Sequence, residues 1–331
     1  MVNSLSQPVS TKAKTVPILI TWDVDPDLWI PFEKRQWALQ TAMNLCHGLN
    51  IPATFFMTAE PAHLLAREVD IMQTQGHEVG CHGLTHGHEE DYDTMSESTQ
   101  QTYIEQATAK LQTLTGTPIH AFRGPRVKTS ATTLKLLAEY GYLADSSVCS
   151  QRLDLISSNL INPGWIFSPR RPYHPHPNNP FKQGDTSLWE IPVSAAVIPF
   201  ISSALRVLGL PALKSLFRVL YAEARFTGKP IVYLAHPTEF GRGSREKKKT
   251  TFQQRFTQYL KPEYFSPTFI RTHGFRMRNL LYTMDGATLL ERTQELFSYM
   301  STFTNVKFMT ISQYVAYLDM IPDEQKSCGQ S

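Results

Sequence analysis

Short apolar segments alternate with longer amphipathic segments along this chain, and that alternation limits the folds available to it. Val16–Thr21, Ala53–Met57 and Ile231–Ala235 are apolar runs of strand length. A helical pattern over Phe32–Leu49 follows the first run, and another over Pro61–Gln75 follows the second. Strands that alternate with helices of about 10–15 residues build a parallel sheet, either open and doubly wound or closed into a barrel.

The remaining patterns extend this alternation to the C-terminal region. Further strands are predicted at Glu78–Gly80, Ala121–Arg123, Leu188–Val193 and Val306–Met309. Further helices are predicted at 94–114, Ala131–Tyr140, Ile201–Phe226 with a break at Gly209, Gly286–Phe303 and Ser312–Leu318. Thr94-Met-Ser-Glu97 has the form of a capping box, which predicts a helix that starts there and stops at Gly116. No Gly/Ser linker divides the chain, and residues 150–187 read as a long loop.

Composition excludes several classes of protein. Hydrophobic residues make up 41% and charged residues 18% of the 331, so the chain is not of the disordered class. The four cysteines are widely spaced without a CxxC pair, which argues against a disulfide framework or a cysteine zinc site. The polar N-terminus has no apolar signal region, and no run of about 18 apolar residues occurs. We therefore expect a soluble, cytoplasmic protein.

Positive charge is concentrated in one segment. Arg242–Arg278 contains ten Lys or Arg against two Glu, a local charge of +8 in a chain of formal net charge +3. Such a segment on an acidic body indicates either an anionic partner met at one place or a solvated surface loop. The Lys247–Lys249 run lacks an accompanying aromatic stacking pattern, so we expect no nucleic-acid partner.

Two carboxylates close the first predicted strand, in the motif TWDVD. Side chains two residues apart on an extended segment point the same way, so Asp23 and Asp25 converge. Adjacent carboxylates repel one another unless a cation or a proton lies between them. The pair therefore indicates a cation or proton site, although such pairs also occur in ordinary turns.

Two histidines follow the third predicted strand, in the motif HGLTH. His82 and His86 are four residues apart, a spacing that puts both on one face of a helical turn. Neutral imidazole is a common zinc ligand, and with one carboxylate these residues would form a His2Asp site that leaves positions open for water and substrate. His77 and His88 are alternative ligands whose spacing fits one face less well.

Arg123 in FRGPR and His236 in YLAHPTEF stand where two other predicted strands end. Alone, such an arginine indicates a structural ion pair and such a histidine a buried, satisfied side chain. Together with the acidic and histidine motifs, they occupy the carboxyl ends of four separate strands. In a parallel α/β barrel those ends form the face on which active sites are built.

The motifs TWDVD, HGLTH, FRGPR, LWEIPVS and YLAHPTEF, in this order and spacing, resemble those of the polysaccharide deacetylase family, also called the NodB-homology or carbohydrate esterase 4 family. The resemblance covers about residues 15–240 and resumes at 306–318. It implies an α/β fold, a distorted (β/α) barrel of about seven parallel strands. It predicts one domain at 15–320 with a long loop at 150–187, a basic insertion at 241–283, and tails at 1–14 and 321–331.

The resemblance also implies roles for the motif residues in metal-dependent hydrolysis of N-acyl groups on sugars. Asp25, His82 and His86 would bind one divalent metal, with Zn²⁺ favoured, although such a site also accepts Co²⁺, Mn²⁺ or Ni²⁺. Asp23 would be the general base, Arg123 would hold Asp23 ionised, and His236 would protonate the leaving amine. Further candidates for substrate contact are Arg126, Glu190, Glu239, Arg276 and Arg278.

The motifs depart from the common family pattern at three places. Val24 separates the two carboxylates, as in a subgroup that acts on small or lipid-linked amides and on some exopolysaccharides. Gly83 replaces the usual Ser or Thr, which removes a hydroxyl that fixes the loop. The usual acidic partner of His236 is also replaced, so Glu239 and Glu190 are both candidates for that role.

The expected substrate follows from the missing export signal and from one apolar segment. The missing signal favours an intracellular acylated amino sugar, linked to a nucleotide or a lipid. Val197–Tyr221 is apolar with only cationic charges, as in an interfacial helix on anionic lipid, although a buried barrel helix would read similarly. Arg276 and Arg278 could hold a pyrophosphate, because guanidinium binds phosphate bidentately.

We therefore expect a hydrolase of linear amide bonds that removes an acetyl or formyl group from an amino sugar during glycan or glycolipid assembly, in the cytoplasm or at the inner face of the membrane. One alternative is allantoinase-like hydrolysis of a non-sugar amide, but those relatives typically lack the complete metal triad. Another is a non-catalytic barrel that binds glycans or membranes, which predicts lost catalytic groups. The sequence leaves the sugar, acyl group, carrier, metal and oligomeric state open.

Overall fold

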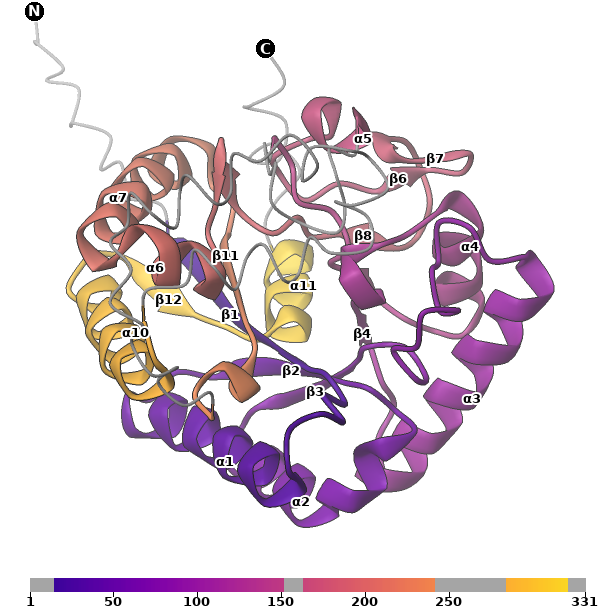
Figure 1. The fold of residues 1–331 in the computed structure, drawn as a ribbon. Coiled ribbons are helices and arrows are strands. Elements are labelled where there is room, and N and C mark those ends of the chain that lie inside the picture. The colour runs from indigo at the N-terminus through magenta and orange to yellow at the C-terminus, as the bar shows by residue number, and fades with distance from the viewer. Residues whose placement is uncertain (1–14, 152–162, 242–283, 321–331) are drawn as a thin grey trace, which may run out of the picture.

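A curled sheet of seven parallel strands forms the centre of the molecule (Figure 1). The structure is a computed structural model, and it describes residues 15–151, 163–241 and 284–320. The strand order is β11-β1-β2-β3-β4-β5-β8, and β12 (Val306–Phe308) also pairs in parallel with the first residues of β1. The seven strands are β1 Val16–Val24, β2 Ala53–Met57, β3 Glu78–Cys81, β4 Ala121–Phe122, β5 Ala144–Asp145, β8 Trp189–Glu190 and β11 Ile231–Ala235. This arrangement confirms the expected distorted α/β barrel.

Helices surround the sheet, and Figure 1 shows α1 to α4, α7 and α10 on its outside. The helices are α1 Phe32–Gly48, α2 Ala66–Thr74, α3 Glu97–Thr115, α4 Ala131–Glu139, α5 Pro163–Phe167, α6 Ser202–Leu208, α7 Leu210–Thr227, α10 Gly286–Ser301 and α11 Ile311–Met320. Short 3-10 turns are η1 Pro61–Leu65, η2 Pro125–Val127 and η3 Pro237–Glu239. Two small antiparallel pairs complete the described elements: β6 Pro175–His176 with β7 Asn179–Gln183, and β9 Ala195–Ala196 with β10 Ile198–Pro199. None of the helices in these ranges is long and apolar enough to span a membrane.

β1 lies inside the sheet, and all nine of its residues are buried. It pairs with β11 and with β2, so residues on both faces of the strand meet protein. Trp22 illustrates the packing, since its ring stacks on Phe55 and meets Phe240 and Phe297 edge-on. The acidic motif is therefore carried by the most rigidly enclosed strand of the sheet.

β8 and β11 are the two edge strands of the sheet, and irregular chain instead of a further strand lies between them. The Val193 N–H donates to the Val148 carbonyl at 2.8 Å, and the Ser194 N–H donates to the Val232 carbonyl at 3.1 Å. The predicted strand Leu188–Val193 is thus regular only at Trp189–Glu190, because the residues after Glu190 turn away to make these bonds. This irregular closure is what makes the barrel distorted.

Most helix ends lie where the sequence predicts them. Gly116 ends α3 in the left-handed conformation, and the chain breaks at Gly209 between α6 and α7 as expected. The predicted start of α3 at Thr94 is wrong. Ser96 is the N-cap, because its backbone is extended and its hydroxyl accepts from the Thr99 N–H at 3.2 Å.

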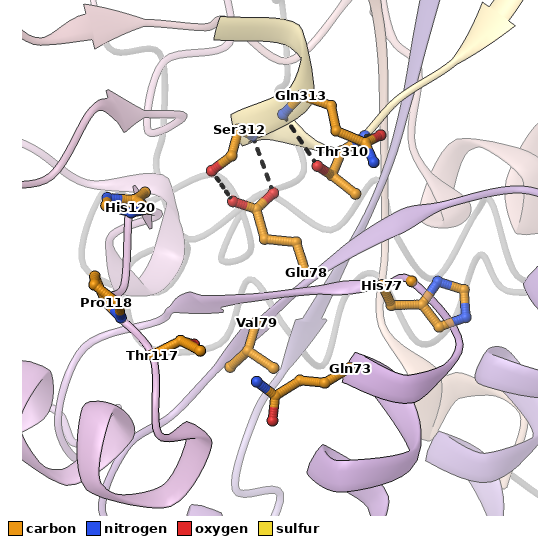
Figure 2. A pocket seen from close by; sticks show the side chains of 11 residues that line it. Gln73, His77, Glu78, Val79, Thr117, Pro118, His120, Thr310, Ser312 and Gln313 are labelled. Atoms are coloured by element: carbon orange, nitrogen blue, oxygen red, sulfur yellow. Dashed lines mark hydrogen bonds between the residues drawn. The ribbon is translucent and has the colours of Figure 1, made fainter. Parts of the chain in front are cut away.

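α11 covers the amino ends of β2 and β3. The Ile311 N–H donates to Thr54 Oγ1 at 3.0 Å, and the Ser312 N–H donates to Glu78 Oε2 at 3.2 Å. A hollow of about 330 Å³ lies here, and Figure 2 shows Ser312 directed at Glu78 while the His77 ring points elsewhere. This edge is opposite the strand ends that carry the motifs, and in barrel folds it serves stability.

Candidate active site

The four motifs meet at the carboxyl edge of the sheet. Asp23 is the penultimate residue of β1 and Asp25 follows that strand directly. His82 follows β3, Arg123 follows β4 and His236 follows β11. Because β1 pairs with β2 and β11, and β3 pairs with β2 and β4, the strand register brings these ends together.

Asp25, His82 and His86 form a cluster that could hold one metal ion. Their ligand atoms all lie within 4.8 Å of one another. Asp25 Oδ1 lies 3.3 Å from His82 Nε2 and 3.5 Å from His86 Nε2. Donors that are about 2.1 Å from a shared tetrahedral ion lie about 3.4 Å apart, so the spacing fits zinc or a similar divalent metal.

The ring of His82 is oriented for this purpose by the arginine motif. His82 Nδ1 lies 2.7 Å from the backbone carbonyl oxygen of Arg123. That carbonyl can only accept, so Nδ1 carries the hydrogen and Nε2 presents its lone pair to the cluster. A hydrogen bond of this kind on the outer ring nitrogen is usual for metal-ligating histidines.

The helical turn that the spacing of His82 and His86 predicts is wrong. His82 to His86 form an irregular loop, in which Gly83 has φ +75° and His86 has φ +58°. The loop folds back so that both rings reach Asp25. His77 lies at the other end of β3, where its Nδ1 accepts from the Ala53 N–H, and His88 is exposed, so neither belongs to the cluster.

Burial and close charges set the pKa values within the cluster. Burial alone would raise the pKa of Asp25, but His86, His82 and His236 together hold it well below its usual range. Burial opposes protonation of His82, yet the Asp23 and Asp25 carboxylates outweigh it and raise the pKa of that histidine. Burial lowers the pKa of His86. The site is thus an ionised carboxylate facing imidazoles, the donor set that a divalent cation neutralises.

Asp23 is held from behind by Arg123, which is completely buried. Arg123 Nη1 donates to Asp23 Oδ1 and to Thr21 Oγ1, both at 2.8 Å. Its other nitrogens donate to the Ser146 carbonyl at 2.9 Å and to Ser146 Oγ at 2.8 Å. Four of the five guanidinium N–H donors are therefore bonded, and the second oxygen of Asp23 faces His82 Nε2 at 3.9 Å.

Thr21 and Ser146 are functional positions that sequence reasoning missed. Thr21 stands two residues before Asp23 on the same strand, so the two-residue period of the strand already placed both on one face. Ser146 lies after β5, and no sequence signal linked it to the arginine motif. Its hydroxyl in turn donates to the Ile191 carbonyl at 2.7 Å, which ties Arg123 to the irregular closure of the barrel.

His236 lies on the other side of Asp25. Its Nε2 is 3.8 Å from Asp25 Oδ2, and its side chain is about one quarter exposed, at 28%. A group able to accept a proton, Asp23, and one able to donate a proton, His236, therefore flank the same three ligands. Such an arrangement suits general acid and base catalysis at a metal.

Neither acidic candidate for tuning His236 is bonded to it among the described residues. Glu239 is buried beside Arg206, with Oε1 3.7 Å from Nη1 of that arginine. Glu190 is fully buried and accepts from the Val148 N–H at 3.1 Å. Within η3, the Thr238 hydroxyl donates to the carboxylate of Asp27.

Glu190 belongs to a buried pair of carboxyl groups with Asp145, its partner in the β5–β8 register. Burial raises the pKa of Asp145 to about 6, and burial together with Asp145 raises the pKa of Glu190 well above its usual value. Side chains that face the pair include Ser147, whose hydroxyl donates to Asp145 Oδ1 at 2.5 Å, and Arg123. Because two adjacent buried carboxylates repel one another, we expect the pair to hold one proton between them.

Arg126, another candidate for substrate contact, lies beside the histidine loop, where its charge helps to lower the pKa of His86. Arg126 binds the chain that follows the histidine loop, donating to the carbonyls of Gly87 and Glu90 and to Asp91 Oδ1. These bonds fix the chain after the histidine loop, and the role of Arg126 in substrate contact stays a prediction. Arg276, Arg278 and the basic segment Arg242–Arg278 lie outside the described residues.

Comparison with known proteins shows which family the first part of the chain resembles. A family model described as polysaccharide deacetylase matches residues 10–144, which include the acidic, histidine and arginine motifs. The resemblance to the polysaccharide deacetylase family is confirmed. No curated protein matches the chain in sequence.

Solved structures agree with the deacetylase fold over nearly the whole chain. A Mycobacterium smegmatis protein assigned as a polysaccharide deacetylase is 18% identical with a TM-score of 0.59, over 95% of this chain and 93% of that one. A Pseudomonas aeruginosa PAO1 protein with the same assignment is 14% identical with a TM-score of 0.57, over 92% and 91%. The Puue allantoinase is 16% identical with a TM-score of 0.55, over 95% and 93%. At these identities the likeness establishes the polysaccharide deacetylase fold and leaves the substrate open.

Proposed function

We propose that this chain is a metal-dependent hydrolase that removes an N-acyl group, acetyl or formyl, from an amino sugar. One observation carries the proposal: Asp25, His82 and His86 converge within 4.8 Å while Asp23 and His236 flank them. A structural metal site would need the ligands alone. The added pair of proton-transfer groups is what hydrolysis of an amide requires.

Each residue has a task in this proposal. Asp25, His82 and His86 would hold a divalent ion, and when bound that ion would supply Lewis-acid polarisation of the acyl carbonyl and lower the pKa of bound water. Asp23, which is positioned by its bond from Arg123, accepts a proton from the attacking water. His236 is open enough to approach substrate and protonates the departing amine nitrogen, without which the C–N bond does not break.

The test measures metal content and turnover in matched variants. Purified protein loaded with Zn²⁺ is assayed for release of acetate or formate from acylated amino sugars presented free, nucleotide-linked and lipid-linked. Asp23→Asn should keep nearly all the metal and lose roughly 10²–10⁴-fold in turnover, the usual worth of a general base. His82→Ala should lose both, and Asp70→Asn, an exposed aspartate on α2, should change neither.

Three results would contradict parts of the proposal. If Asp23→Asn loses the metal as completely as His82→Ala, Asp23 is a ligand and not the base. If the loaded protein releases no acyl group from any sugar but opens a cyclic ureide, the allantoinase-like alternative is correct. If it does neither while still binding glycan, the barrel is non-catalytic.

A finer part of the proposal is that the amino sugar is lipid-linked and is met at a membrane surface. Support comes from exposed apolar side chains around α6, namely Val197, Ile198 and Leu208, which are 58%, 39% and 45% exposed. α6 adjoins the His236 loop through the contact of Arg206 with Glu239. An apolar surface beside the site suits a lipid carrier.

The cations of Val197–Tyr221 contribute less to this surface than their number indicates. Arg206 is buried and donates to the Met284 carbonyl, while Arg218 and Lys214 lie against the Tyr299 ring. The apolar face of α7 that includes Leu213 and Phe217 is buried in the core. The segment is therefore part barrel helix and part exposed surface, and the membrane proposal depends on the exposed part.

A further inference from the structure

The loop that carries His86 is organised around a buried carboxylate that belongs to none of the motifs. Glu90 is completely buried. Its Oε1 accepts from the Leu84 N–H at 2.6 Å and from the Tyr92 hydroxyl at 3.0 Å. Its Oε2 accepts from the Thr85 N–H and the His86 N–H, both at 2.7 Å, and from Thr85 Oγ1 at 3.0 Å.

Three consecutive backbone N–H groups thus converge on one carboxylate. Such a concave set of amides is an anion-binding nest, which usually forms where one residue of the run is left-handed. In this run His86 has φ +58°, a left-handed conformation that is uncommon for non-glycine residues. Glu90 supplies the internal anion that holds the loop in this form.

The glycine at position 83 fits the same arrangement. A Cβ on Gly83 would lie 2.4 Å from Glu90 Oε1 and 2.9 Å from Pro125 Cγ, and its φ is +75°. The Ser or Thr that the family usually has here would therefore collide with the Glu90 carboxylate. In this chain the Glu90 carboxylate therefore takes the place of the missing Ser or Thr hydroxyl in fixing the loop, and it needs glycine at position 83.

We propose that Glu90 is a positioning residue for the metal site: its carboxylate fixes the Leu84–His86 backbone so that the His86 ring faces Asp25. Glu90 bonds to none of the three ligand atoms, and it acts through the His86 N–H. In this loop conformation His86 Nε2 lies 3.5 Å from Asp25 Oδ1. The inference rests on the proposed metal site, but not on the substrate or on turnover.

The central experiment compares Glu90→Gln with Glu89→Gln. The Glu90→Gln side chain keeps the shape of the carboxylate, but its NH₂ group would face backbone N–H donors, so the nest loses acceptors. Zn²⁺ affinity, measured by competition with a chelator well below the unfolding temperature, should fall about 10–100-fold, as is usual when an outer partner of a ligand is lost. Glu89 is the matched control, because it is exposed and also contacts Thr85 Oγ1. Its change to Gln removes the same charge.

Two further measurements separate positioning from general stability. X-ray absorption of the Zn²⁺-loaded proteins should show two histidine ligands in the parent and one in Glu90→Gln. In metal-free protein, hydrogen exchange at the Leu84, Thr85 and His86 amides should accelerate in Glu90→Gln and stay unchanged in Glu89→Gln. If Glu90→Gln does not fold, Tyr92→Phe removes a single donor to the carboxylate and should weaken Zn²⁺ binding by a smaller factor.

The outcomes are distinct from those that decide the proposed function. Parental Zn²⁺ affinity with two histidine ligands in folded Glu90→Gln overturns the inference, as does an equal loss in Glu89→Gln, which would indicate a long-range charge effect. If Glu90→Gln does not fold, unchanged Zn²⁺ affinity in Tyr92→Phe together with unchanged amide exchange overturns the inference. A parent that binds Zn²⁺ and releases no acyl group refutes the proposed function while leaving the role of Glu90 intact.

Discussion

The pair of Arg123 and Asp23 allows a quantitative test of how the candidate base is held. Arg123 is 0% exposed and Asp23 2% exposed, and the two are joined by a bond of 2.8 Å. Two unit charges about 4 Å apart attract by about 4 kcal/mol at an effective dielectric constant of about 20. Removal of one partner of a buried pair costs about 3–5 kcal/mol, because the other charge is left uncompensated.

These magnitudes predict strong coupling between two substitutions. Arg123→Met and Asp23→Asn should each lower the free energy of unfolding by about 3–5 kcal/mol. The double variant leaves no unpaired charge, so its loss should fall short of the sum of the two by about 2–3 kcal/mol. Urea unfolding of the three variants and the parent, with chelator present to exclude metal, measures this difference.

A second pair on the same protein provides the control. Arg126 and Asp91 are also joined at 2.8 Å, but both side chains are about one fifth exposed, at 19% and 22%. Coupling between Arg126→Met and Asp91→Asn should therefore stay below about 1 kcal/mol. Additivity within about 0.5 kcal/mol for the Arg123 and Asp23 cycle would refute the claim that this arginine holds an ionised Asp23.

Two further predictions concern pH and salt. A carboxyl group whose pKa is raised on folding stabilises the fold while protonated, so stability should fall as pH rises from the ordinary value of 3.8 for Asp145 through its folded value of about 6. Glu190→Gln removes one member of the shared-proton pair, and the urea midpoint of this variant should vary less between these pH values; an unchanged slope would contradict the shared proton. Binding to anionic vesicles should weaken between about 0.1 M and 1 M salt, where the screening length falls from about 10 to 3 Å, and should weaken at fixed salt when Lys247, Lys248 and Lys249 are changed to Gln. Absence of vesicle binding at low salt would favour a nucleotide-linked or free sugar.

The fold class was predictable from the sequence because it depends on local periodicity. β2 and β11 have the predicted bounds, Ala53–Met57 and Ile231–Ala235, since short apolar runs have few alternatives once helices of a parallel sheet flank them. Positions just after such strands reach a shared edge in any parallel sheet. For that reason the convergence of the acidic, histidine, arginine and terminal histidine motifs could be expected without coordinates.

Only the tertiary structure decided which partners those residues have. Arg123 bonds to Thr21 and Asp23, residues 102 and 100 positions away, and to Ser146, which follows the next strand. The spacing of His82 and His86 predicted a helical turn, whereas the Glu90 carboxylate folds the loop another way. Sequence periodicity reports the local backbone conformation of neighbouring residues. The hydrogen-bond donors around a buried charge come from segments far apart in the sequence, so local periodicity does not predict them. For the same reason, the burial of Glu90 and Glu190 was visible only in the packed structure.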